Sequence, residues 1–180
     1  KATMPDASPA VRTALHKLAE TAVLTSQGVP FIFAGDEVMR DKSGVHNSYN
    51  SPDSINAIRW ELKAKNREVF DYVCGLIDMR RHHPAFRLGD ADRVRECLEF
   101  LPVKEANVVA FRLKGAPAGD TWQDITVILN ARSRSTAIDL PEGTWQVVAR
   151  DGRIDARRGL GTMPGGQVSV GPRSALILHR

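Results

Sequence analysis

The chain has 180 residues, of which 42% are hydrophobic and 26% are charged, so it holds enough apolar material for a sizeable core. Its formal net charge is +4, and the basic residues are spread without a run of five, which does not indicate a nucleic-acid partner. No stretch is apolar over the roughly 18 residues that a membrane span requires. These features predict a globular protein with neither a nucleic-acid nor a membrane partner.

Two cysteines, Cys74 and Cys97, are too far apart for a CxxC motif and too few for a disulfide framework. We expect both to be buried free thiols. The first residue is Lys1 rather than Met, and prolines follow closely in a loop-like opening. This opening suggests that the chain begins inside a longer protein.

The first half predicts two helices around one buried strand. After Ser8, apolar residues recur at helical spacing until Gly28, and the apolar run VPFIFAG over residues 29–35 is typical of a strand buried in a parallel sheet. A long polar loop follows to about Asn66, and a second helix should then continue to the His-His-Pro sequence that ends at Pro84. A lone parallel strand leaves both edges unpaired, so this half is expected to be the tail of a larger barrel.

The second half changes character near Leu88, where short β-branched and aromatic runs alternate with turn residues. Their spacing predicts an antiparallel sandwich, preceded by a helical turn at 90–96. The glycine-rich and charged stretch 151–166 is expected to be a mobile loop. The strands are expected over 97–103, 107–113, 124–130, 135–140, 144–149, 167–170 and 174–179.

Asp36 and Glu37 directly follow the predicted strand, where α/β folds place reactive groups. The two carboxylates of a glycosidase stand roughly 5 to 9 Å apart and face one site, whereas neighbours on a strand point in opposite directions. We therefore favour Glu37 as a structural hydrogen-bond acceptor over a catalytic role.

The loop GVHNSYNSPDSIN, residues 44–56, concentrates the amides, hydroxyls and carboxylate that bind neutral polyhydroxylated ligands. The same residues also form turns by capping their own backbone, so both interpretations stay open. Trp60 is a candidate sugar platform, whereas Trp122 and Trp145 flank strands and are expected to pack in the sandwich. No histidine has a partner at metal-ligand spacing, and glycine-rich phosphate loops are absent from the sequence, which predicts neither a metal nor a cofactor.

Three segments carry a resemblance to a known family. In QGVPFIFAGDE, residues 27–37, the glycines, proline and Glu37 match the G-x-P-x-x-x-x-G-x-E pattern of the last barrel strand in the α-amylase family of glycoside hydrolases. NSYNSPDSIN, residues 47–56, is more particular to pullulanase-like debranching enzymes, and the terminal QVSVGPRSALIL is similar to the last strands of their C-terminal β domain. The chain thus resembles the C-terminal part of type I pullulanases over nearly its whole length.

This resemblance implies an α+β architecture in which residues 1–88 form the last strand and helices of a (β/α)8 catalytic barrel and residues 89–180 form an antiparallel β-sandwich. It also implies a longer protein that hydrolyses α-1,6-glucosidic linkages in pullulan, starch or glycogen by a retaining double displacement. The family's three catalytic carboxylates come from earlier barrel strands, and no motif in this chain matches theirs. The chain alone is therefore expected to be inactive and to need the missing N-terminal part of the barrel and an α-glucan substrate as partners.

Asn47, Tyr49, Asn50 and Asp53 match the family loop that shapes the donor-side sugar subsites at the barrel mouth. Asp53 is the main candidate, because a carboxylate accepts hydrogen bonds from two hydroxyls of one glucose. Glu37 matches a position that is better assigned to structural support.

Two alternatives to an enzyme part remain from the sequence. The sandwich could be a carbohydrate-binding module, which an exposed tryptophan platform would favour. It could also be a purely structural module that braces the last barrel helix, which an apolar patch on the facing surface would favour.

Overall fold

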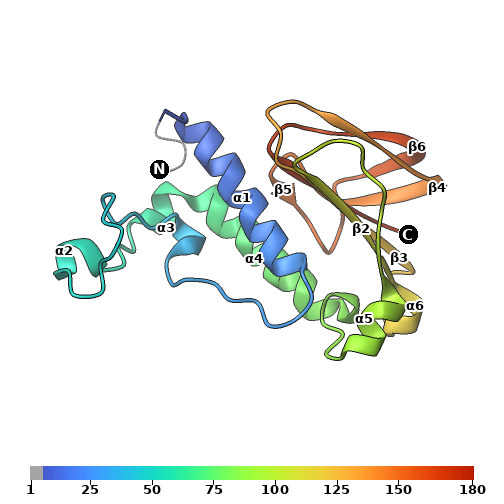
Figure 1. Ribbon diagram of the computed structural model, residues 1–180, viewed down its shortest axis with the longest axis horizontal. Helices are drawn as coiled ribbons and strands as arrows, with labels where there is room; N and C mark the ends of the chain where they lie inside the picture. Colours follow the sequence, from blue (N-terminus) through green and yellow to red (C-terminus); the bar gives the residue numbers. More distant parts are fainter. Residues whose placement is uncertain (1–5) are drawn as a thin grey trace.

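The computed structural model describes residues 6–180, in which a pair of long helices packs against an antiparallel sheet (Figure 1). Within these residues, none of the helices has the length and apolar character needed to cross a membrane. The helices are α1 (Pro9–Thr25), η1 (Asp36–Val38), α2 (Asp53–Asn56), α3 (Leu62–Lys65), α4 (Arg67–His82), η2 (Pro84–Phe86), α5 (Ala91–Cys97) and α6 (Gly115–Ala118). The strands are β1 (Leu98–Phe100), β2 (Val108–Lys114), β3 (Asp124–Asn130), β4 (Thr136–Arg150), β5 (Arg153–Ile154), β6 (Thr162–Val170) and β7 (Ser174–His179).

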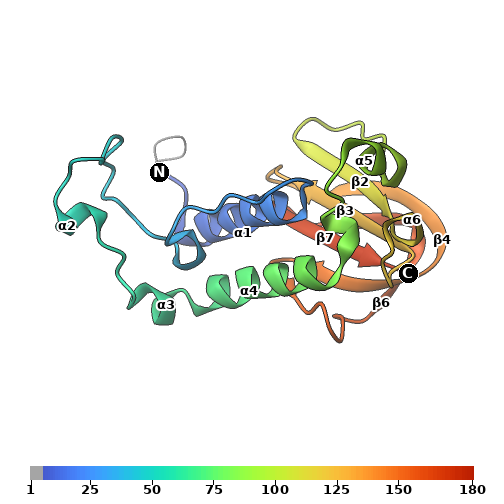
Figure 2. The same cartoon turned by 90° about the horizontal axis from the view of Figure 1, so that it is seen from below.

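The two long helices form where the sequence predicted them. The Ser8 hydroxyl accepts a hydrogen bond from the Val11 N–H at 3.3 Å, and Pro9 occupies the first turn of α1, where its missing N–H costs nothing. Helix α4 ends at His82, because Pro84 cannot continue it. The two helices lie side by side over one face of the sheet (Figures 1 and 2).

The buried strand expected over residues 29–35 does not form, and that prediction is wrong for this chain as it stands. The segment is extended and runs from the end of α1 back toward its start (Figure 2). Val29 and Phe31 are 96% and 85% exposed. A strand needs neighbours for its backbone N–H and C=O groups, and within the described chain none of the seven strands pairs with this segment.

The sheet is antiparallel throughout, in the order β1-β2-β3-β7-β4-β5, with β6 pairing with β4. The long strand β4 pairs with β6 from Thr136 and with β7 from Gln146, and its register shifts between Leu140 and Thr144. That irregularity lets one strand contribute to both layers of a sandwich. The predicted combination of helices with an antiparallel sheet is therefore confirmed.

Two apolar clusters hold the molecule together, one on each face of the central strands. Between the layers of the sandwich, Trp145 is fully buried, and its indole N–H donates to the Pro141 carbonyl at 3.0 Å. The other cluster joins the helices to the outer face of the sheet. Its largest fully buried members include Leu24, Leu76, Met79, Phe86, Leu113, Ile125 and Ile177.

The strand predictions hold best for β3 and β7, which are buried along almost their whole length. The observed β3 and β7 coincide with the expected 124–130 and 174–179, while 135–140 and 144–149 join into one strand. The expected helical turn becomes α5, whose N-terminal amides are capped by Asp90. The mobile loop expected over 151–166 is wrong in part, because it contains β5 and the beginning of β6.

The prediction of two buried thiols is correct for Cys97 and wrong for Cys74, which is exposed. Helix α4 buries the stripe that includes Val69, Val73 and Leu76. Cys74 follows Val73 by one residue and is therefore turned about 100° away from that stripe.

Candidate functional site

The polar loop begins at η1, a tight turn that follows the extended segment. Gly35 and Met39 flank the turn with φ angles of 99° and 57°, a conformation that is strained for Met39 because it has a Cβ. The Glu37 carboxylate accepts a hydrogen bond from the Gly35 N–H at 3.0 Å. This is the kind of contact that the structural interpretation of Glu37 requires.

Asn56 ties the loop together. Its amide Nδ2 donates to the carbonyl oxygens of Ser48 and Ser51, at 2.6 and 2.8 Å. The backbone carbonyl of Asn56 accepts a hydrogen bond from the Arg40 guanidinium, which also donates to the Ala34 carbonyl at 3.1 Å. The loop backbone is thus closed by side-chain hydrogen bonds rather than by regular structure.

Two further side chains extend this framework. Lys42 Nζ donates to the hydroxyl of the buried Ser48 at 2.6 Å, and Asn66 Nδ2 donates to the Val38 carbonyl at 2.7 Å. Sequence reasoning missed Arg40, Lys42 and Asn66 as loop-forming residues. Their polar character was visible, but their target carbonyls depend on the folded path of the loop.

The four residues predicted to bind sugar all lie on the outside of this framework. Asn47, Tyr49, Asn50 and Asp53 are exposed, and the Tyr49 side chain is 85% accessible. Asp53 opens the four-residue helix α2. Among the hydrogen bonds found in residues 6–180, none involves its carboxylate. The interpretation of Asp53 as a turn cap is therefore not supported by a hydrogen bond. The loop brings the four residues into one short segment with their polar groups accessible.

An open groove of about 680 Å³ lies between the start of α1, the turn η1 and the first part of the loop. Phe33 lines it, with the Arg40 guanidinium 5.3 Å and the Lys42 ammonium 4.9 Å from the ring centroid. His16 and His46 also line the groove. Trp60 lies outside this lining and is 63% exposed. The region therefore presents aromatic rings beside hydrogen-bonding groups, a combination suited to sugar rings.

The histidines are placed without a metal-ligand arrangement. Within the described part of the chain, no three His, Cys, Asp or Glu side chains are grouped to hold a metal ion. His83 Nδ1 lies 2.8 Å from the buried Asp120 carboxylate, which also accepts the N–H groups of Trp122 and Ala85. Burial raises the pKa of Asp120, but these hydrogen bonds outweigh it and hold the pKa below its ordinary value.

The tryptophans of the sandwich do not form an open platform. Trp145 is fully buried, as expected for sandwich packing. Trp122 is stacked between two imidazoles, with ring centroids 3.4 Å from His83 and 4.0 Å from His179. Both faces of its indole are therefore covered, which counts against these residues as the platform of a carbohydrate-binding module.

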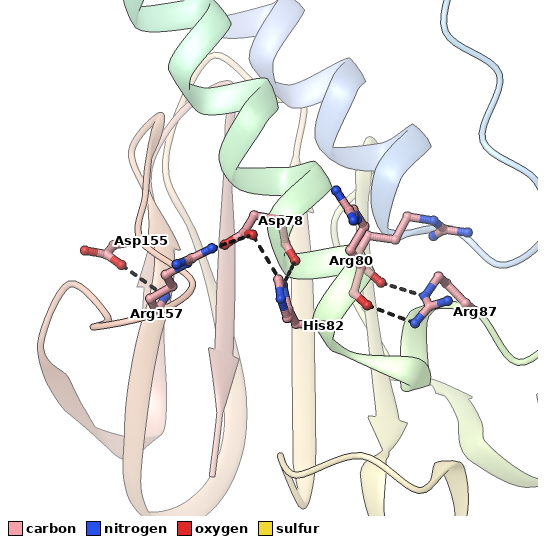
Figure 3. Close-up of polar contacts among 7 residues, drawn as sticks. Asp78, Arg80, His82, Arg87, Asp155 and Arg157 are labelled. Atoms are coloured by element: carbon pink, nitrogen blue, oxygen red, sulfur yellow. Dashed lines mark hydrogen bonds and ion pairs between the residues drawn. The ribbon is translucent and has the colours of Figure 1, made fainter.

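A polar cluster joins α4 to the loop between β5 and β6 (Figure 3). Arg157 donates two hydrogen bonds to the Asp78 carboxylate, at 2.9 and 3.0 Å, and Asp155 accepts the Arg157 N–H. The hydrogen bond from Arg157 is the main cause that lowers the pKa of Asp78, and His82 on the next turn also lowers it. This cluster connects the helical half to the sandwich and holds part of the expected mobile loop.

Comparison with known proteins shows that the chain is similar to the C-terminal part of pullulanases. Residues 94–153 match the family model described as the pullulanase all-beta domain. The chain is similar to pullulanase from Bacillus acidopullulyticus, with a TM-score of 0.92 and 41% identity over 98% of this chain and 21% of that one. It also resembles pullulanase type I from Bacillus subtilis, solved with maltose, at a TM-score of 0.88 and 33% identity over 98% and 24% of the two chains.

A curated Bacillus subtilis pullulanase is 40% identical over 138 residues, which cover 77% of this chain and 19% of the relative. The resemblance to type I pullulanases that the sequence predicted is thus confirmed. The chain spans about a fifth of the length of the relatives it matches.

Proposed function

We propose that this chain is the C-terminal part of a pullulanase-like debranching glycoside hydrolase that cleaves α-1,6-glucosidic linkages in pullulan, starch or glycogen. The observation that carries the proposal is the likeness of 98% of the chain to a pullulanase at a TM-score of 0.92. The α-glucan substrate is supported by the maltose bound to a relative. Accessible polar groups on a cross-linked loop give the chemistry that such a substrate requires.

In this proposal residues 1–88 complete a (β/α)8 barrel and residues 89–180 form its C-terminal sandwich. The unpaired segment 29–35 supports the division. Val29 and Phe31 project into solvent on one side, while Ile32 packs against the core on the other. A strand that is apolar on both sides fits a barrel wall between two layers, where neighbouring strands would pair with its backbone. The missing N-terminal part of the barrel is the partner that would supply those strands.

The proposed role of the loop is to bind substrate. Asn47, Tyr49, Asn50 and Asp53 would contact sugar hydroxyls, while Glu37 supports the turn from which the loop begins. We assign no catalytic residue to this chain, and the acid/base and nucleophile carboxylates would come from the missing barrel strands. The chain alone would then release no sugar from pullulan.

A chimera tests this function directly. In it, the chain replaces the matching segment of the Bacillus acidopullulyticus enzyme, and reducing-end release from pullulan is measured. We expect the chimera to hydrolyse pullulan, while both the host lacking the segment and this chain alone stay at the level of the blank. Activity of the isolated chain, or a folded chimera without activity, would overturn the proposal.

The structural alternative is also tested by this chimera. A module that only braces the barrel would tolerate loss of the four loop side chains without a change in kcat/KM. A carbohydrate-binding module would instead retain affinity for a glucan when the isolated chain is assayed by affinity electrophoresis. Both alternatives therefore predict results that differ from those of a substrate-binding loop.

A further inference from the structure

His16 on α1 contacts the turn from which the substrate loop begins. Its Nε2 lies 2.7 Å from the carbonyl oxygen of Asp36, within η1. A carbonyl oxygen only accepts hydrogen bonds, so Nε2 carries the proton and donates it. The same carbonyl accepts the Met39 N–H at 2.9 Å. His16 therefore uses the second lone pair of a carbonyl that already closes the turn.

Glu20 lies one helical turn further along α1, on the same side of the imidazole as the Asp36 carbonyl. Its Oε1 is 3.8 Å from His16 Nε2, too far to compete for the proton that Nε2 donates to Asp36, and Glu20 is only 6% exposed. Its other oxygen, Oε2, is buried and has no hydrogen-bond partner among residues 6–180. A buried carboxylate without full partners destabilises the fold more than an apolar side chain of similar volume would.

The turn itself needs external support. Met39 has a positive φ of 57°, a conformation that costs energy in a residue with a Cβ and persists only when its surroundings hold it. Thr13, one turn before His16 on the same helix, has its hydroxyl 3.7 Å from the Met39 sulfur. Immediately after Met39, Arg40 binds the carbonyl of Asn56. A shift of the η1 backbone would therefore move Arg40 and, through its hydrogen bond to Asn56, the loop at 44–56.

We propose that His16 is a positioning residue: its imidazole fixes the η1 turn and thereby the loop at 44–56. The inference rests on the proposed function for its effect on substrate. Its structural part concerns only α1 and the turn. His16 does not need to touch sugar for this role.

Hydrogen exchange of the isolated 180-residue chain tests the structural part. His16→Ala removes the donor, and we expect amides 36–56 to exchange about tenfold faster, as the loss of one such hydrogen bond implies. His16→Gln retains an N–H donor and should restore much of the protection. Lys17→Met is the matched control, because Lys17 is the neighbouring residue but contacts Glu68 and Gly152 instead. Equal exchange in wild type and His16→Ala would overturn the proposal.

Kinetics of the chimera test the effect on substrate. We expect His16→Ala to raise KM for pullulan about tenfold with kcat within about twofold, because a misplaced binding loop weakens binding without removing reacting groups. Lys17→Met should leave KM unchanged.

The two readouts separate the two proposals. An inactive wild-type chimera would contradict the proposed function, and the exchange measurement would still decide whether His16 holds the turn. Faster exchange together with an unchanged KM would overturn the positioning role. His16→Ala and Lys17→Met could also both lower kcat by the same factor by which they raise KM. That result would indicate general destabilisation and would overturn the positioning role as well.

Discussion

The guanidinium of Arg80 donates a hydrogen bond through Nη2 to the carbonyl of Gly28 at 2.6 Å, joining α4 to the turn that ends α1. Its Nη1 also donates to the carbonyls of Leu24 and Ser26, at 3.0 and 2.7 Å. Arg80 is 5% exposed, and Arg87 in turn binds the Arg80 carbonyl at 2.7 Å (Figure 3). One buried cation therefore satisfies the carbonyl end of α1 and directs the chain into the extended segment.

Replacement of Arg80 should destabilise the chain strongly. Arg80→Lys loses the planar fork, and we expect a fall of about 1–3 kcal/mol in the free energy of unfolding because a carbonyl is left unpaired. Arg80→Ala should cost more than Arg80→Lys. Urea denaturation measures both values. The exposed neighbour Arg81 is the matched control, and an equal loss in Arg81→Ala would contradict the assigned role.

The contact between Arg157 and Asp78 should produce an acid-dependent link between the two halves. A lowered Asp78 pKa adds stability above the ordinary aspartate pKa, near 3.9, and that stability is lost as the pH falls through the folded value. Arg157→Ala should return the Asp78 pKa toward its ordinary value in an NMR titration. The stability effect should be small and decrease with salt, since both groups reach solvent. Arg158→Ala is the control, and an Asp78 pKa that stays low in Arg157→Ala would refute the contact.

The stacked histidines predict a second pH dependence. Burial, with a contribution from nearby His83, lowers the pKa of His179 to about 4. The unfolded chain then binds a proton near pH 6.5 that the folded chain does not, so stability should be complete above this pH and fall toward about pH 4. His179→Gln should reduce that slope in denaturation curves between pH 4 and 7. Identical slopes in His179→Gln and wild type would contradict the assignment.

Local sequence signals predicted the elements that are stabilised locally. The cap at Ser8, the proline after α4 and the short apolar runs of β3 and β7 are all signals that lie within a few residues. The failure at 29–35 has the opposite cause, since a strand depends on neighbours that its own residues cannot supply. A similar limit applies to Arg80, whose three carbonyl partners lie 52 to 56 residues earlier in the chain and leave no local signal.

The residues of the candidate site could be predicted from the sequence, but the hydrogen bonds that hold the loop could not. The amides and the carboxylate of the stretch 47–56 indicate a binding loop, and the exposed positions of Tyr49 and Asp53 suit that role. The framework that holds it is made by Arg40 and Asn56, whose partners lie up to 16 residues away. Long-range hydrogen bonds of this kind leave no periodic pattern in a sequence.

The exposed carboxylate of Asp53 has no hydrogen-bond partner among the described residues. In the chimera, Asp53→Ala should lower kcat/KM for pullulan by roughly one to two orders of magnitude. A charge-assisted hydrogen bond to a sugar hydroxyl contributes about 1.5–3 kcal/mol, which corresponds to that factor. The Tm should stay within about 1 °C, because the side chain supports no other part of the loop.

Glu61→Ala is the matched control, since Glu61 is an exposed acid of the same polar region outside the stretch 47–56. It should leave kcat/KM for pullulan and for a short branched dextrin unchanged. Unchanged kinetics and a lowered Tm in Asp53→Ala would indicate that Asp53 caps its own loop. A loss beyond about four orders of magnitude would instead be the signature of a reacting carboxylate, because removal of a binding group away from the scissile bond leaves the acid/base chemistry in place.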